Sequence, residues 1–172
     1  MDDVAQNIDS FEQAPPRGML AQGQQKVEIL HILEDADDPR IPAFLLRVVS
    51  DIEQYDMARI SALEILRFNT YDEPYYDQIG VRLCFLAQND KDPDVRIHAA
   101  LALGNYIKAP GVVETVLNIG SDSREDTIVR DNAIAALEKI VPDPALIAAV
   151  VALTADPIMG SAAQWILDTW QQ

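Results

Sequence analysis

Apolar residues recur at intervals of three and four along most of this chain, which is the spacing of amphipathic helices. The clearest stretch is 90–106, where an acidic turn is followed at once by small and apolar residues. One helical stripe there is formed by Val95, Ala99, Ala102, Leu103 and Tyr106. Asp92 or Asp94 can cap this helix, because a carboxylate accepts hydrogen bonds from the N–H groups of the first turn. The pattern therefore predicts a capped helix over 94–107.

The rest of the chain predicts helices in pairs behind a leading helix at 24–36. In that leading helix the apolar face consists of Val27, Leu30, Ile32 and Leu33. The chain contains only seven glycines and no long β-branched alternation, which argues against a β fold. The predicted pairs span residues 41–52 with 55–68, 72–88 with 94–107, 111–119 with 127–141, and 145–153 with 158–170.

The N-terminal residues differ from this regular pattern. Residues 1–23 carry Pro15, Pro16 and two glycines, which oppose a long helix. Ile8, Phe11, Met19 and Leu20 offer apolar contacts to the body, and one short helix is expected around 4–13. We predict a flexible N-terminal arm over 1–23 and a single domain over 24–172.

The second helix of each pair repeats. Residues 95–104, Val-Arg-x-x-Ala-Ala-x-Ala-Leu-Gly, align with 129–138 and 58–67, and more weakly with 159–168. The successive starts lie 37, 34 and 30 residues apart, so each interval holds one helix pair. A single pair cannot bury its own apolar stripe. The pairs are therefore expected to stack into a solenoid with a continuous core.

The motif at 90–104, Asp-x-Asp-Pro-Asp-Val-Arg-x-x-Ala-Ala-x-Ala-Leu-Gly, resembles the second-helix signature of HEAT repeats. The closest form is the short repeat of lyase-like HEAT proteins, and the repeats cover about residues 41–170. The resemblance implies an all-α, right-handed α-solenoid of about four HEAT-like helix pairs plus a leading helix. It also implies that the second helices line the concave face.

The alignment places Arg59, Arg96 and Arg130 in one column. In HEAT-like proteins this arginine pairs with an acid at the turn of its own or an adjacent repeat. The resemblance thus implies a structural ladder, for which Glu53, Asp90 and Asp126 are available. An anion-binding ladder is the alternative.

The acidic clusters at 35–38, 90–94 and 122–126 offer oxygen ligands for a divalent metal. None follows the pattern of an EF-hand loop, because Pro93 and Val95 replace the glycine turn and Leu101 stands where the glutamate is needed. Helix capping explains these acids more simply. We predict no metal and no cofactor.

Residues of the second helices that lie off the core stripe are the candidate protein-binding site. Ile60, Ile97, Leu101 and Trp165 would be apolar anchors with acids around them, which is typical of a protein-binding patch. The alternative is that neighbouring repeats or the N-terminal arm cover these side chains. The full predicted set is Ile60, Glu64, Ile97, His98, Leu101, Asn105, Asp131, Glu138 and Trp165.

The net charge of −15 narrows the choice of partner. It repels nucleic acid and anionic lipid and attracts a basic protein. The single cysteine, Cys84, excludes an internal disulfide and is expected to be a small buried hydrophobe. The chain has no signal-peptide pattern and no long apolar run, so we expect a cytoplasmic protein that does not bind membranes and is monomeric when free.

No sequence pattern indicates catalysis. The two histidines share no metal-ligand spacing, and phosphate loops and nucleophile elbows are absent from the sequence. The favoured function is therefore a non-catalytic, acidic scaffold that binds a protein, with an immunity or antitoxin-type inhibitor of a basic effector as a specific form. The alternatives are a bilin lyase-like or pigment-attachment HEAT protein, which the resemblance implies, and an acidic DNA mimic.

Overall fold

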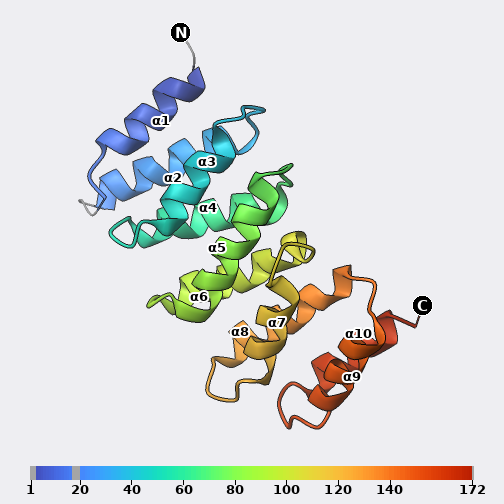
Figure 1. Cartoon of the computed structure of the whole chain (residues 1–172). Coiled ribbons are helices and arrows are strands. Elements are labelled where there is room, and N and C mark those ends of the chain that lie inside the picture. The colour runs from blue at the N-terminus through green and yellow to red at the C-terminus, as the bar shows by residue number, and fades with distance from the viewer. Residues whose placement is uncertain (1–2, 17–19, 172) are drawn as a thin grey trace. The chain divides into compact units, whose positions relative to one another are not determined.

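The computed structural model describes residues 3–16 and 20–171, so Met19 of the predicted arm lies outside the described residues. The described residues form ten α-helices, two short 3-10 helices and no strand (Figure 1). The predicted all-α solenoid class is confirmed, and its four helix pairs are α3–α4, α5–α6, α7–α8 and α9–α10. The chain divides into two compact units, residues 1–71 and 72–172, whereas the sequence placed the division after residue 23.

The N-terminal unit contains two helices ahead of the first repeat pair. Phe11 of α1 meets Phe44 of α3 edge-on, with ring centroids 5.1 Å apart and planes at 89°. Helix α2 packs against α4, and α3 packs against α4. The segment predicted as an arm therefore contains a packed helix and the start of a second. The bounds are α1 Asp3–Gln13, α2 Leu20–Glu34, α3 Ile41–Ser50 and α4 Asp56–Phe68.

Helix α2 buries most of the face that was predicted, since Leu30 and Leu33 are buried. Ile32 is the exception, because it is 62% exposed while Ile29 is buried. The buried stripe also includes Gly23 and Lys26. The apolar run from Val27 to Leu33 contains residues on every side of the helix, so it does not fix which side faces inward.

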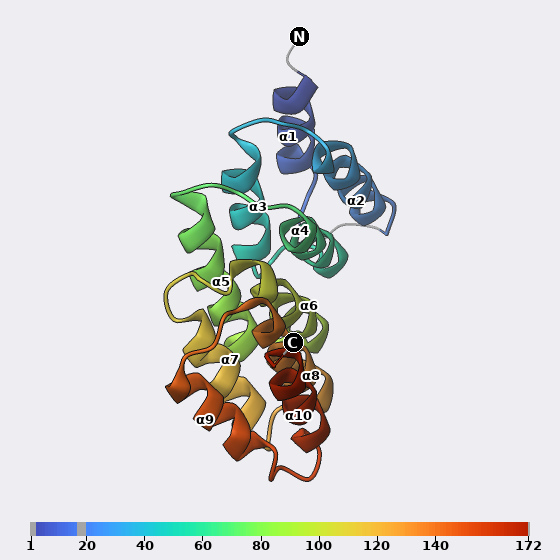
Figure 2. The same ribbon diagram turned by 90° about the vertical axis from the view of Figure 1, so that its right-hand side faces the viewer.

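The C-terminal unit is the regular part of the molecule. Helices α5, α7 and α9 form one row, and α6, α8 and α10 form a second row beside it (Figure 2). The bounds are α5 Tyr75–Asn89, α6 Pro93–Ala102, η1 Leu103–Tyr106, α7 Val112–Ser121, α8 Thr127–Ala136, η2 Leu137–Lys139, α9 Pro144–Leu153 and α10 Gly160–Thr169.

Aspartate side chains cap the N-termini of α6 and α8 in this unit. Asp92 Oδ1 accepts hydrogen bonds from the backbone N–H groups of Asp94, at 2.8 Å, and Val95, at 3.4 Å. Asp126 caps α8 in the same way, through the N–H of Ile128 at 2.8 Å. Each such cap is worth about 1 kcal/mol. The capping interpretation therefore holds for both repeats, and Asp92 rather than Asp94 is the cap of α6.

Candidate functional site

The second helices of the C-terminal unit lie side by side, since α6 packs against α8 and α8 against α10. The repeat spacing brings Leu101, Ala135 and Trp165 to equivalent positions, 34 and then 30 residues apart. Trp165 is 50% exposed, Ala135 is exposed and Leu101 is half-buried. We call these three residues the apolar row. Ala135 was not among the predicted site residues, although the repeat spacing alone could have found it.

Acidic side chains flank the apolar row. Asp131 and Glu138 of the predicted set are exposed and lie four residues before and three after Ala135. Asp168 stands three residues after Trp165, and its carboxylate accepts a hydrogen bond from the Gln164 side chain at 2.8 Å. An apolar centre with an acidic rim has the composition of a protein-binding surface whose partner carries basic residues.

The remaining predicted residues of α6 and η1 are partly engaged within the chain. His98 Nδ1 lies 2.8 Å from the carbonyl oxygen of Asp94, one turn earlier, so this nitrogen is the donor. Asn105 Oδ1 accepts a hydrogen bond from Lys139 Nζ at 2.5 Å, which links η1 to η2. Ile97 is half-buried. These side chains border the apolar row, and Asn105 also joins two neighbouring repeats.

The two predicted residues in the N-terminal unit differ from those in the C-terminal unit. Ile60 is only 7% exposed, so it belongs to the core and is not an exposed anchor. Ile60 lies on α4, which packs against both α2 and α3. Glu64, on the same helix, is half-buried.

The arginine column braces the helix pairs. Arg130 is 1% exposed and donates from Nε and Nη2 to the Gly120 carbonyl at 3.0 and 2.8 Å. Its Nη2 also donates to Asp156 Oδ2 at 2.5 Å. Arg59, 2% exposed, donates to the Val49 carbonyl at 3.3 and 3.1 Å. These arginines therefore satisfy the carbonyls that end the first helix of each pair.

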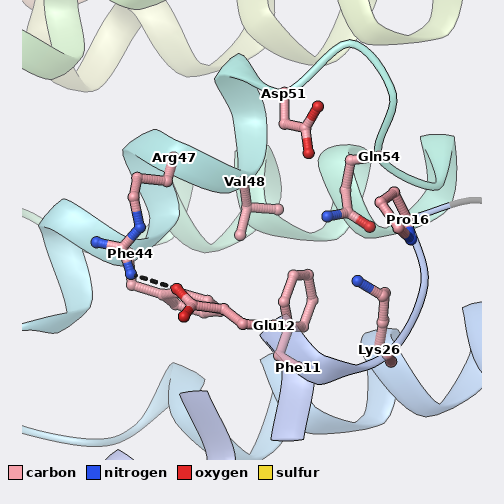
Figure 3. A pocket seen from close by; sticks show the side chains of 10 residues that line it. Phe11, Glu12, Pro16, Lys26, Phe44, Arg47, Val48, Asp51 and Gln54 are labelled. Atoms are coloured by element: carbon pink, nitrogen blue, oxygen red, sulfur yellow. Dashed lines mark hydrogen bonds and ion pairs between the residues drawn. The ribbon is translucent and has the colours of Figure 1, made fainter. Parts of the chain in front are cut away.

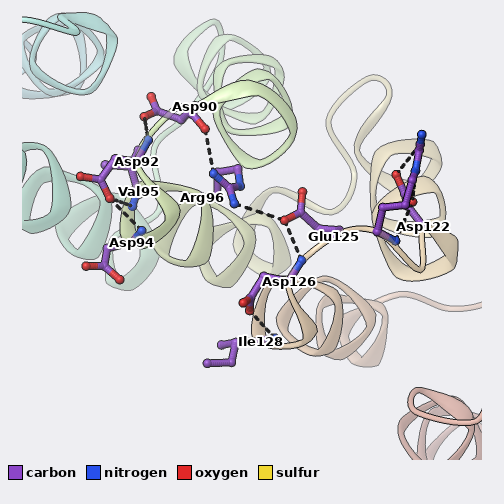
Figure 4. A network of polar contacts seen from close by, with 10 residues as sticks. Asp90, Asp92, Asp94, Val95, Arg96, Asp122, Glu125, Asp126 and Ile128 are labelled. Carbon is purple, nitrogen blue, oxygen red and sulfur yellow. Dashed lines mark hydrogen bonds and ion pairs between the residues drawn. The ribbon is translucent and has the colours of Figure 1, made fainter.

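Arg96 connects two successive repeats of the same unit (Figure 4). Its Nη1 donates to the Asp90 carbonyl at 3.0 Å, and its Nη2 to Glu125 Oε1 at 3.4 Å. The acids that pair with Arg96 and Arg130 are thus Glu125 and Asp156, and Asp90 contributes its carbonyl to Arg96. The resemblance implied an acid at the turn of the arginine's own or an adjacent repeat, and the acids found lie in the turn of the following repeat, although they are not the side chains of Glu53, Asp90 or Asp126 that the sequence offered.

Asp156 is the most heavily hydrogen-bonded of these acids. Its Oδ1 accepts from the backbone N–H groups of Ile158 and Met159 at 2.8 and 2.9 Å. The Met159 N–H, the Arg130 side chain and the Ile158 N–H together lower the pKa of Asp156 from 3.8 to about 2. One carboxylate therefore both caps the turn before α10 and pairs with a buried arginine.

The described residues give little support for a metal site or for a reactive cysteine. Within residues 3–16 and 20–171, no group of three His, Cys, Asp or Glu side chains is arranged to hold a metal ion. Cys84 is buried, and burial raises the pKa of its thiol. This makes the thiolate, which is the nucleophilic form, less accessible.

No helix in the described part of the chain is long and apolar enough to cross a membrane.

Comparison with known proteins gives one family match. The family model for HEAT repeats matches residues 82–167, which is half of the 172-residue chain. The matched segment contains the apolar row, Arg96 and Arg130. No curated protein and no solved structure matches the chain.

Proposed function

The chain belongs to the HEAT-repeat family, and from that premise we propose that it is a non-catalytic scaffold that binds another protein through its second helices. HEAT repeats generally mediate binding between proteins. The observation that carries the proposal is the apolar row of Leu101, Ala135 and Trp165, which spans three adjacent helices and has exposed acids on its borders.

Trp165 is the anchor of the proposed interface. Tryptophan is enriched among the few residues that supply most of the binding energy in protein interfaces. A 50% exposed indole on a helix that the rest of the repeat holds in place offers a large apolar area at a small cost in side-chain entropy. Leu101 extends this area by one repeat on the other side of Ala135.

The charge of the chain supports a basic partner. At −15, the protein attracts a basic surface over a distance set by the ionic strength. The specific form we propose is an inhibitor of a basic effector, of the immunity or antitoxin type, that is monomeric when free. Salt should slow its association strongly, because steering by charge acts mainly on the association rate. An association rate that does not change with salt would refute the electrostatic part.

The scaffold proposal is tested by partner capture from a lysate of the native host. Trp165→Asp on α10 and Val151→Asp on α9 form a matched pair, because both side chains are 50% exposed and lie on opposite helix rows. We expect Val151→Asp to capture the same proteins as the wild type and Trp165→Asp to lose them. If both variants capture the same proteins as the wild type, the second helices are not the binding surface.

A further inference from the structure

A cavity of about 250 Å³ opens in the N-terminal unit, among α1, α2, α3 and the loop that follows α3 (Figure 3). Its wall combines aromatic rings with charged groups. The rings belong to Phe11 and Phe44, and the charged groups to Glu12, Lys26, Arg47 and Asp51. None of these residues was among the predicted site residues, and all lie within the unit of residues 1–71.

Lys26 is the unusual member of this wall. It is 1% exposed and lies on the buried stripe of α2. Its Nζ sits 4.2 Å from the centroid of the Phe11 ring, which is a cation–π distance. Among the described residues, no group hydrogen-bonds to or forms an ion pair with this ammonium. The ammonium is not a fully buried atom without a hydrogen-bond partner, so it faces the open cavity, where water or a ligand can solvate it.

Asp51 is the complementary group. It is half-buried, and its Oδ1 accepts a hydrogen bond from the backbone N–H of Glu53 at 3.0 Å. Among the described residues, no cation pairs with it. The other two charged groups of the wall neutralise each other, since Arg47 Nη2 donates to Glu12 Oε1 at 2.7 Å. Among the described residues, the cavity therefore presents one ammonium and one carboxylate that form no ion pair with each other, although Asp51 acts on the ammonium and raises its pKa.

We infer that this cavity binds a small zwitterion of the amino-acid type, with its carboxylate at Lys26, its ammonium at Asp51 and an apolar side chain against Phe11 and Phe44. A ligand of this kind gives each unpaired group the opposite charge that it lacks. It also has no net charge, so the −15 of the protein does not repel it.

The size and charges of the cavity disfavour other ligand classes. A volume of about 250 Å³ lies below the range of about 300–1,000 Å³ that is typical of sites for drug-sized ligands, so the cavity suits a small molecule. A phosphate ester would carry about two negative charges. The cavity offers it one lysine, Lys26, and Asp51 would repel it, so a phosphate ester fits these charges poorly. The aromatic rings favour an apolar side chain over a polar one.

This inference is separate from the scaffold function, because the cavity and the apolar row lie in different units. The test is calorimetric titration of the full chain with L-leucine and with L-phenylalanine. Two analogues remove one charge each: leucinamide lacks the carboxylate, and N-acetyl-leucine lacks the ammonium. We expect the amino acids to bind, and each analogue to bind about tenfold or more weakly, because each loses one charge-assisted hydrogen bond.

Substitutions of Lys26 and Asp51 test which residue binds the carboxylate of the ligand and which binds its ammonium. Lys26→Met should weaken binding of L-leucine about tenfold or more, and so should Asp51→Asn. Lys91→Met, which removes an exposed lysine of the other unit, should leave binding unchanged. The inference is overturned if neither amino acid binds at about 10 mM, or if Lys26→Met binds as tightly as the wild type.

A measurement on the wild-type chain removes any dependence on how the variants fold. Burial lowers the pKa of Lys26, while Asp51 and Glu12 act in the opposite direction. Arg47, the other charged group of the wall, is paired with Glu12. A ligand carboxylate at Nζ would raise the pKa of Lys26, which nuclear magnetic resonance of the lysine side chain detects. L-Leucine binding without a change in the titration of Lys26 would show that the ligand binds elsewhere.

Discussion

Arg130 and Lys26 are equally buried cations in the two units, yet their surroundings are opposite. Each is 1% exposed. Arg130 donates to the Gly120 carbonyl and to Asp156. Among the described residues, Lys26 lies over the face of the Phe11 ring and forms no ion pair, although Asp51 and Glu12 raise its pKa. The comparison indicates two uses of a buried charge: Arg130 holds the helices together, whereas we propose that Lys26 offers its charge to a ligand.

The repeat explains why, among the described residues, Arg130 forms an ion pair with an acid and Lys26 does not. In the C-terminal unit, Arg96 and Arg130 each find an acid in the turn of the following repeat, Glu125 and Asp156. The acid that pairs with each of these arginines therefore recurs with the repeat. Lys26 lies on α2, ahead of the first repeat pair, and Asp51 in the turn after α3 raises its pKa without forming an ion pair among the described residues.

The largest effect is expected for Arg130→Met. Methionine fills part of the space but leaves the Gly120 carbonyl and Asp156 without their donor, so the free energy of unfolding should fall by about 3 kcal/mol. Tryptophan fluorescence during urea denaturation reports this, because both tryptophans, Trp165 and Trp170, lie in the C-terminal unit.

The control for that variant is Arg96→Met. Arg96 has a side chain that is 20% exposed and a longer ion pair, so its loss should cost about 1 kcal/mol. Equal losses for the two variants would mean that burial of the arginine does not set its contribution.

For Lys26→Met, the change in the free energy of unfolding is expected to have the opposite sign. The substitution removes a buried charge without removing a hydrogen bond among the described residues, so the N-terminal unit should gain about 1 kcal/mol. Amide hydrogen exchange in α2, at Leu30 for example, measures this locally. Faster exchange at Leu30 in the variant would show that the ammonium stabilises the fold, and the comparison with Arg130 would fail.

A smaller effect on stability is expected from the protonation of Asp156 in acid. The folded-state pKa of Asp156 is about 2, below its ordinary value of 3.8, so the ionised carboxylate stabilises the fold. Its contribution is complete above about pH 4 and is lost as the pH falls towards 2. Acid titration of tryptophan fluorescence should therefore show less destabilisation between pH 4 and 2 in Asp156→Asn than in the wild type. An identical acid transition in both proteins would contradict this assignment.

The sequence predicted the parts of the molecule that repeat. The spacing of Val95, Ala99 and Ala102 predicted α6, and Asp92 was recognised as a possible cap, because both features depend only on neighbouring residues. The repeat offsets also placed Leu101 and Trp165 on equivalent turns of adjacent second helices.

Features that depend on contacts between helices were not predictable in the same way. Ile60 aligns with Ile97 yet is buried on α4, between its contacts with α2 and α3, and the sequence alignment does not show this difference. Lys26 follows two glutamines and has the appearance of a solvated residue, and only the packing of α1 and α3 shows that it is buried. The acids that pair with Arg96 and Arg130 depend on how one repeat stacks on the next.

The most direct test of the central claim, that the second helices bind a protein partner, is the affinity of the captured partner for the matched variants. Trp165→Asp on α10 should weaken binding about 30-fold or more, which corresponds to the loss of an interface anchor of about 2 kcal/mol. Val151→Asp on α9, with the same exposure, should leave the affinity unchanged. Equal affinities for both variants, or a larger loss for Val151→Asp, would contradict the account.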